Sequence, residues 1–250
     1  MLRAAGCVFA EDETRLLIAA ARSPAELADM VDRRAAGVPV EYLVGWADFF
    51  GLRIAVESGV FIPRRRTEFL VRVAKSFAPR GAVVVELCCG SGAVGAALLA
   101  VLEQIELYAV DHDPAAVRCA RRNVGSGGRV YEGDLYGPLP ASLCGRVDLL
   151  VANAPYVPAD EVGLLPREAR LYEPRTALDG GADGLDVVRR VTSGAVEWLA
   201  PGGKLLVEIS DRQAPRTVED MERCGLRPRV ASSDELNATV VIGVENGRSG

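Results

Sequence analysis

Histidine and paired cysteines, from which most zinc sites are built, are almost missing from this chain. His112 is the only histidine, and the six cysteines show no Cys-x-x-Cys spacing. A zinc site needs clustered ligands, so the sequence predicts no bound metal. Most of the thiols are expected to be free and buried.

Long apolar runs and a leader are also lacking. No apolar stretch reaches the roughly 20 residues that a membrane-spanning helix needs. The N-terminus has no charged-then-apolar signal pattern. We therefore expect a cytoplasmic protein without membrane contact. The length of 250 residues, 49% of them apolar, suits one substantial α/β domain with a small appendage.

An excess of positive charge is missing as well. The net charge of −5 disfavours sequence-independent binding to nucleic acid, because such binding depends on neutralising phosphates. One local basic run, Arg64-Arg65-Arg66, either touches an acidic partner or forms a solvated turn. The sequence leaves both interpretations open.

Residues 1–45 are predicted to be a short helical N-terminal segment. Residues 11–22 carry leucines among alanines and charges, and Ser23-Pro24-Ala25-Glu26 has the pattern of a capping box with proline at the first helical position. Two short helices make little core alone, so we expect them to lean on the main domain. Residues 46–66 are predicted to form a β-hairpin linker, with its strands in 51–63 on either side of Glu57-Ser58-Gly59.

Residues 67–250 are predicted to form the main domain, an α/β fold with a doubly wound parallel sheet. Apolar strands alternate with helical segments, which is typical of such sheets. The expected strands span 82–87, 107–110, 129–131, 147–152 and 204–209, and the expected helices 92–101, 114–124 and 184–199. Residues 239–244 have no helix after them and are expected to finish the sheet as an edge hairpin.

A glycine-rich loop follows the first of these strands. It consists of Glu86, Leu87, Cys88, Cys89, Gly90, Ser91, Gly92, Ala93, Val94 and Gly95. Its glycines satisfy the dinucleotide fingerprint, which alone is a weak signal. A carboxylate at Glu86 would repel a pyrophosphate but attract the cationic methionine portion of S-adenosylmethionine. The loop therefore favours S-adenosylmethionine over a nicotinamide.

Two further carboxylates follow the next strands. Asp111 is placed to accept hydrogen bonds from ribose hydroxyls, with His112 at the rim of the site. Asp134 is placed to accept from an adenine amine, with Leu135 against the ring. Any one of these acids could be a helix cap or turn residue. Three acids that end three successive strands, Glu86 among them, indicate a cofactor site.

The fourth strand ends at a proline-stiffened loop, Asn153-Ala154-Pro155-Tyr156. Taken alone it could be a rigid turn with Tyr156 in the core. At the carboxyl end of a central strand, however, the Asn153 side-chain oxygen and the Ala154 carbonyl could each accept one hydrogen of a planar NH₂ group. Tyr156 could stack on that group. The loop therefore predicts methyl transfer to an amide or amine nitrogen.

With these motifs placed, the chain resembles the glutamine methyltransferases that modify peptide-chain release factors. The likeness runs from about Gly37 to the C-terminus and includes the segments 37–45 and 62–68. The stretch 173–185, which reads EPRTALDGGADGL, is long and specific.

The resemblance implies a Rossmann-like, seven-stranded class I methyltransferase fold and methylation of a glutamine side-chain amide in a protein substrate. Asn153, Ala154, Pro155 and Tyr156 stand at the family's Asn-Pro-Pro-Tyr loop. Cofactor contacts are implied at Cys88, Cys89, Gly90, Ser91, Gly92, Asp111, Leu135 and Asn153. Three departures are Ala154 in place of the first proline, a shorter helical N-terminal part, and Leu135 in place of a larger ring.

Other functions stay open at this point. An adenine-amine methyltransferase acting on nucleic acid would make the same demands on the loop, although the acidic chain lacks a basic tail. Ala154 would also suit a relative that binds the cofactor without catalysis. A nicotinamide oxidoreductase is the third and weakest alternative.

Overall fold

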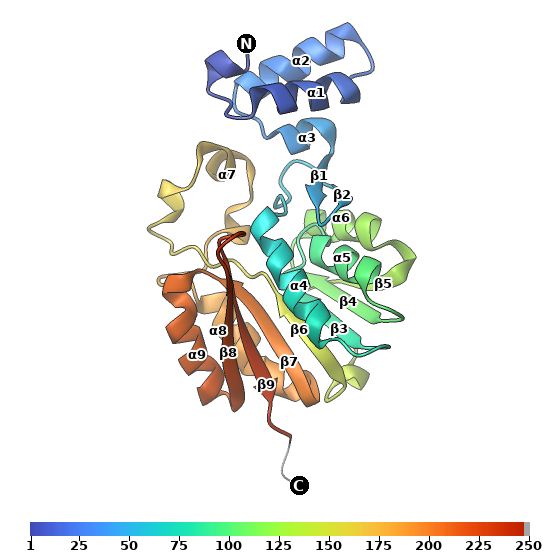
Figure 1. Ribbon diagram of the computed structural model, residues 1–250, viewed down its shortest axis with the longest axis vertical. Helices are drawn as coiled ribbons and strands as arrows, with labels where there is room; N and C mark the ends of the chain where they lie inside the picture. Colours follow the sequence, from blue (N-terminus) through green and yellow to red (C-terminus); the bar gives the residue numbers. More distant parts are fainter. Residues whose placement is uncertain (248–250) are drawn as a thin grey trace.

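One seven-stranded sheet forms the centre of the molecule in the computed structural model, which describes residues 1–247 (Figure 1). The strand order is β5-β4-β3-β6-β7-β9-β8. The first five strands in this order, β5, β4, β3, β6 and β7, are parallel to one another. The last two, β9 and β8, are each antiparallel to their neighbours. The strands are β3 Val83–Leu87, β4 Glu106–Asp111, β5 Gly128–Glu132, β6 Val147–Ala152, β7 Leu199–Ile209, β8 Leu226–Ser233 and β9 Ala238–Glu245.

Helices cover both faces of the sheet. One face carries α4 Glu68–Phe77, α5 Ala93–Val101 and α6 Pro114–Val124, and the other carries α8 Asp186–Trp198 and α9 Ala214–Arg223. The predicted α/β class and doubly wound sheet are confirmed, although α4, α9 and β8 were not predicted. Over residues 1–247 no helix is both long and apolar enough to cross a membrane.

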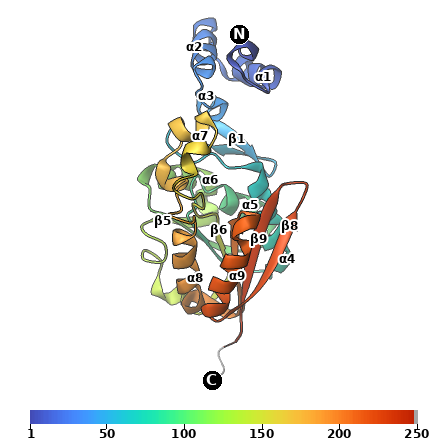
Figure 2. The same cartoon turned by 90° about the vertical axis from the view of Figure 1, so that its left-hand side faces the viewer.

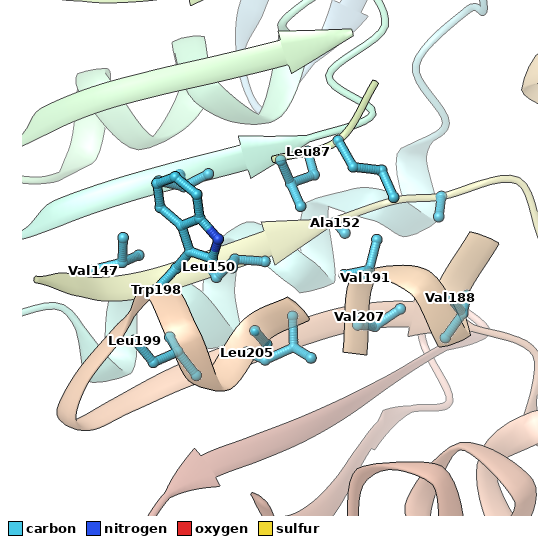
Figure 3. Packing of buried hydrophobic residues seen from close by; sticks show 14 of the residues in the cluster. Leu87, Val147, Leu150, Ala152, Val188, Val191, Trp198, Leu199, Leu205 and Val207 are labelled. Atoms are coloured by element: carbon cyan, nitrogen blue, oxygen red, sulfur yellow. The ribbon is translucent and has the colours of Figure 1, made fainter. Parts of the chain in front are cut away.

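Apolar side chains pack between the sheet and α8. Leu150 of β6 and Leu205 of β7 are fully buried, and they lie beneath Val191 and Trp198 of α8 (Figure 3). The parallel strands are apolar on both faces because helices cover both. This packing fixes the carboxyl end of β6, where the predicted reacting loop begins.

The end of the chain forms the predicted antiparallel hairpin at the edge of the sheet. Within this hairpin β9 is the inner strand, between β7 and β8, and is buried along its whole length. The edge strand is β8, whose residues after Leu226 are half-buried or exposed and which stands beside α9 (Figure 2). β7 begins at Leu199, five residues earlier than predicted, and its pairing with β6 shifts register between Val147 and Leu149.

The linker hairpin is present but lies earlier than predicted. It pairs β1 Trp46–Phe49 with β2 Leu52–Ala55, and Phe50 and Gly51 form the turn with φ of 53° and 76°. Two successive residues with positive φ suit a tight hairpin turn. Phenylalanine rarely takes this conformation, so the sequence did not predict the turn at this position. Val60 and Ile62 are buried without forming a strand.

The N-terminal helices form a small core of their own. α1 Ala10–Ala20 and α2 Pro24–Ala35 pack with α3 Val40–Val44 around the buried Leu17 and Met30. They stand at one end of the molecule, away from the sheet (Figure 1). They were expected to lean on the main domain, but α3 completes their apolar core, and their contact with Glu168 of the main domain is polar. Ser23 caps α2 as predicted, accepting a hydrogen bond from the Glu26 amide at 3.1 Å.

A buried arginine ties these helices together. The Arg34 guanidinium donates to both carboxylate oxygens of Glu13, at 2.7 and 3.0 Å, and to Glu168 at 2.7 Å. Arg34 is only 6% exposed. Glu168 belongs to α7 Arg167–Tyr172, so this one side chain also joins the N-terminal helices to the segment after β6.

We expect Arg34→Met to lower the free energy of unfolding of the N-terminal helices by about 3 kcal/mol, because it leaves the Glu13 carboxylate buried without a partner. The control Arg33→Met removes an exposed ion pair with Asp29 and should cost less than about 0.5 kcal/mol. Urea denaturation followed by hydrogen exchange in residues 10–35 measures both. Equal effects of the two variants would contradict this role of Arg34.

Candidate active site

A cavity of about 360 Å³ lies at the carboxyl ends of β3, β4 and β6. Ligands of open α/β sheets bind at this position, in pockets of roughly 300–1,000 Å³. The sequence-predicted residues that line it are Glu86, Cys88, Cys89, Gly90, Ser91, Asp111, His112, Asp134, Leu135, Asn153, Ala154, Pro155 and Tyr156. The fold thus brings together residues from four separate strand ends.

Gly92 is the one predicted site residue that does not line the cavity. It precedes α5 with φ of 75°, and an added Cβ would lie 3.0 Å from the Ala120 backbone. Its role in the structure is to let α5 begin close against α6. Gly92 therefore allows close packing of two helices. The glycine pattern in the sequence does not distinguish this role from contact with a ligand.

Asp111 organises the glycine-rich loop. Its carboxylate accepts hydrogen bonds from the Gly90 amide at 2.8 Å and the Asp113 amide at 3.0 Å. Burial raises the pKa of Asp111, and these two bonds oppose the rise. Each carboxylate oxygen has a second lone pair, so the predicted bonds to ribose hydroxyls fit beside the bonds to the loop.

The Glu86 carboxyl is buried at the inner end of the cavity. Its side chain accepts a hydrogen bond from the Gly95 amide at 2.9 Å, and an added Cβ at Gly95 would lie 2.5 Å from the same oxygen. Burial raises the pKa of Glu86 to about 8. A cationic ligand would stabilise the ionised form and lower that pKa, as the predicted contact with a methionine amine requires.

At the rim of the cavity, the side chains of Asp134 and His112 are more exposed to solvent than the Glu86 carboxyl. Asp134 forms an ion pair with Arg190 of α8, a partner that the sequence did not predict. Leu135 is only 9% exposed and faces the cavity from the same loop. The His112 ring is largely exposed, with Nδ1 3.6 Å from the Asp111 carboxylate. These positions fit the predicted contacts with adenine and ribose.

Two acceptors of the reacting loop are free of protein donors. The Asn153 side-chain amide donates through Nδ2 to Thr67 Oγ1 at 3.2 Å, which leaves Oδ1 available. Within residues 1–247 no protein donor is bonded to Asn153 Oδ1 or to the Ala154 carbonyl. Both residues line the cavity. They can therefore accept the two hydrogens of one planar NH₂ group.

Tyr156 is held from two sides. Its hydroxyl donates to Glu208 Oε1 at 3.3 Å, and the Arg66 guanidinium lies 5.5 Å from the centre of its ring. Burial raises the pKa of Tyr156, so its hydroxyl stays protonated. Arg66 lies over one face of the ring, and Tyr156 lines the cavity, where stacking on a substrate group was predicted.

The specific stretch 173–185 forms the support behind the reacting loop. Its backbone bonds to Val157 through Leu178 and Gly180. An added Cβ at Gly180 would lie 2.6 Å from the Pro155 carbonyl, and one at Gly184 would lie 2.3 Å from the Tyr156 carbonyl. The glycines of this stretch are therefore needed for close approach of two backbone segments.

The Gln213 side chain links the reacting loop to the stretch 173–185. Its Nε2 donates to the Tyr156 carbonyl at 2.8 Å and to the Asp183 carbonyl at 3.1 Å. Its Oε1 accepts from the Ser210 hydroxyl at 2.7 Å. Sequence reasoning missed Gln213, because nothing in its surroundings along the chain distinguishes it from an ordinary residue at the start of a helix.

Two arginines of the basic run make internal ion pairs. Arg64 lies 2.5 Å from Glu173, which also accepts a hydrogen bond from the Ile62 amide at 3.3 Å. Arg66 lies 3.4 Å from Glu208. Only Arg65 fits the solvated turn, and neither sequence interpretation foresaw the internal pairs. The segments 62–68 and 173–185, both quoted for the family resemblance, are joined by Arg64 and Glu173.

We expect Gly184→Ala to lower the free energy of unfolding by about 2–4 kcal/mol and to abolish activity, because the methyl group would displace the Tyr156 carbonyl and strain a backbone with φ of 78°. Gly202→Ala is the matched control. Gly202 has φ of 76° and open space around its Cβ position, so only the strain of about 1 kcal/mol remains. Thermal unfolding and a turnover assay compare the two. Similar losses in both would refute the close-approach argument.

Comparisons with known proteins agree with this geometry. Residues 52–165 match the methyltransferase small domain family. The release factor glutamine methyltransferase of Geobacter sulfurreducens is 38% identical over 88% of this chain and 79% of its own length. That of Mycolicibacterium smegmatis is 41% identical over 90% of this chain and 82% of its own length.

Solved structures share the fold at low identity. A methyltransferase from Pyrococcus furiosus superposes with a TM-score of 0.60 at 18% identity, over 79% of this chain and 90% of that one. The ribosomal protein L11 methylase of Lactobacillus delbrueckii subsp. bulgaricus gives 0.55 at 13% identity, over 78% and 86%. These likenesses confirm the predicted seven-stranded class I methyltransferase fold.

The class I fold and the family together confirm the predicted use of S-adenosylmethionine, and the cavity has a suitable volume with the buried Glu86 carboxyl in its wall. With relatives of 38% and 41% identity across most of both chains, this chain belongs to the release factor glutamine methyltransferase family.

Proposed function

We propose that this protein methylates the side-chain amide nitrogen of a glutamine in a peptide-chain release factor. The observation that carries the proposal is the pair of free acceptors, Asn153 Oδ1 and the Ala154 carbonyl, at the cavity. A primary amide presents two hydrogens in one plane, so one amide satisfies both acceptors. The relatives are release factor glutamine methyltransferases, which supports the same substrate.

When bound, S-adenosylmethionine supplies an electrophilic methyl group with a good leaving group behind it. The chain's own residues orient the poorly nucleophilic amide and exclude water. Such positioning can supply roughly 7–11 kcal/mol when it is ideal. Methylation of the neutral amide would release one of its two N–H protons to solvent, and the acceptor bonded to that proton would ease its departure.

A second cavity, of about 510 Å³, adjoins the first and offers room for the protein substrate. The two cavities share Phe61, Arg66, Val157 and Leu178 in their walls. Pro39 and Glu41 of the N-terminal part complete the outer wall. A substrate segment lying in the second cavity could therefore extend one side chain past Arg66 toward Asn153.

We also infer that the protein acts in the cytoplasm. All six cysteines are free thiols, and three of them are buried. Free thiols are typical of proteins that work in a reducing compartment. Release factors act at ribosomes, which places the proposed substrate in the same compartment.

We expect the wild-type protein to transfer a labelled methyl group from S-adenosylmethionine to a purified release factor, and not to total RNA. Asn153→Ala should reduce kcat by at least about 100-fold, because one of the two amide acceptors is lost. The Kd for S-adenosylhomocysteine should stay within about threefold, since most of the cavity is unchanged. Mass spectrometry of the product locates the modified residue. Label found only in RNA would reject the proposal in favour of the adenine-amine alternative.

We expect binding of S-adenosylmethionine to strengthen as the pH rises from 6 toward 8. The pKa of Glu86 is about 8 without a ligand, and a bound cation lowers it, so binding releases a proton below that pH. The affinity should rise by up to about tenfold per pH unit from this group. Glu86→Gln should remove this part of the pH dependence.

Calorimetry in two buffers of different ionisation enthalpy measures the released proton. The ligand amine titrates equally in every variant, so the difference from wild type isolates Glu86. Glu132→Gln, an exposed change at the end of β5 outside the cavity, is the matched control and should behave as wild type. Unchanged proton release in Glu86→Gln would show that Glu86 does not face the cation.

A further inference from the structure

Glu208, near the end of β7, is a buried carboxyl next to the reacting loop. The proposed reaction assigns it no role. Its side chain is 1% exposed. Oε1 accepts from the Tyr156 hydroxyl at 3.3 Å and lies 3.4 Å from Arg66 Nε. Over residues 1–247 Oε2 has no hydrogen-bond partner of normal geometry. An unpaired buried oxygen is costly, so this atom requires a donor.

The Thr67 side chain is a buried hydrogen-bond donor beside the same loop. It is 2% exposed, and its hydroxyl oxygen accepts from Asn153 Nδ2 at 3.2 Å. The hydroxyl hydrogen needs an acceptor in the same buried place. Hydrogen bonding with the Thr67 side chain lowers the pKa of Glu208, and Glu208 Oε2 is the unpaired buried acceptor beside the same loop. Thr67 therefore connects Glu208 to Asn153.

The direction of this chain of hydrogen bonds matters for the reaction. An ionised carboxylate only accepts, so the Thr67 hydroxyl must donate to Glu208 and can only accept from Asn153. Asn153 then turns its NH₂ toward Thr67 and its Oδ1 away. In the opposite orientation the Asn153 NH₂ would meet the NH₂ of the substrate, and two donors cannot bond to each other.

We propose that Glu208 acts through Thr67 as a positioning residue that fixes the orientation of the Asn153 side-chain amide, so that its oxygen faces the substrate nitrogen. This rests on the proposed function, because it concerns how the same loop receives an amide. Glu208 holds Tyr156 directly, so one carboxylate sets both ends of the reacting loop.

The neighbours of Glu208 make this arrangement sensitive to acid. Burial raises the pKa of Glu208, and Thr67, Arg66 and Tyr156 oppose the rise. Arg66 and Tyr156 are the charged and titratable groups in contact with it, and the paired residue on β9 is the apolar Val240. Protonated Glu208 becomes a donor, and the Thr67 hydroxyl is then free to donate to Asn153 Oδ1. The kcat should therefore fall on the acid side in wild type.

The test begins with Thr67→Val, which keeps the shape of the side chain without its hydroxyl. We expect kcat on the release factor to fall by about 10–100-fold, as for misplaced catalytic groups, while KM for S-adenosylmethionine stays within about twofold. Thr67→Ser keeps the hydroxyl and should recover most of the lost kcat. Thr67→Ala serves if Thr67→Val does not fold. An unchanged kcat in a hydroxyl-free variant would overturn the proposal.

The double variant Thr67→Val with Glu208→Gln separates one connected chain from two independent effects. If Glu208 orients Asn153 only through Thr67, the double variant turns over no more slowly than the slower single variant. The acid-side fall in kcat should also disappear in Glu208→Gln. Losses that multiply, or an acid limb that persists unchanged, would overturn the proposal.

One measurement needs no substrate. The side-chain NH₂ resonances of Asn153, assigned by their absence in Asn153→Asp, should shift as wild type is acidified and stay constant in Thr67→Val. A wild type that methylates no release factor but shows this titration would reject the proposed function alone. Resonances that titrate identically in both proteins would reject the role of Thr67.

Discussion

The close approach of two backbone segments, 153–157 and 178–184, is the constraint on which the site depends. The reacting loop leaves the sheet at the end of β6, and the second segment runs directly behind it, bonded through Val157. Side chains at Gly180 or Gly184 would occupy the space of the loop carbonyls. The loop is thus held by backbone on one side and by Glu208 and Thr67 on the other, which leaves its acceptors facing the cavity.

Much of the fold and of the cofactor site could be predicted from sequence, because both depend on local patterns. Buried strands are continuous apolar runs, and the carboxyl ends of parallel strands meet at one edge, so Glu86, Asp111 and Asn153 could be placed together in advance. The Phe50-Gly51 turn could not, because phenylalanine gives no signal for positive φ.

The residues that sequence reasoning missed all act across long distances in the chain. Thr67 meets Asn153, Glu173 meets Arg64, and Gln213 meets Tyr156. Each is an ordinary turn or helix-end residue in its own surroundings, and its partner is set by tertiary packing. The family resemblance includes the segments that carry Thr67 and Glu173, and the structure shows that Arg64 and Glu173 join these two segments.

The ion pair between Arg34 and Glu168 gives the N-terminal helices an influence beyond their own small core. Glu168 is part of the wall of the second cavity, and Arg34 is anchored between α1 and α2 by Glu13. Pro39 and Glu41, which follow α2, lie in the same wall, so a shift of these helices would move one side of the second cavity. If a partner bound to the helical end, its binding and the binding of a side chain in that cavity would each change the other by the same free energy.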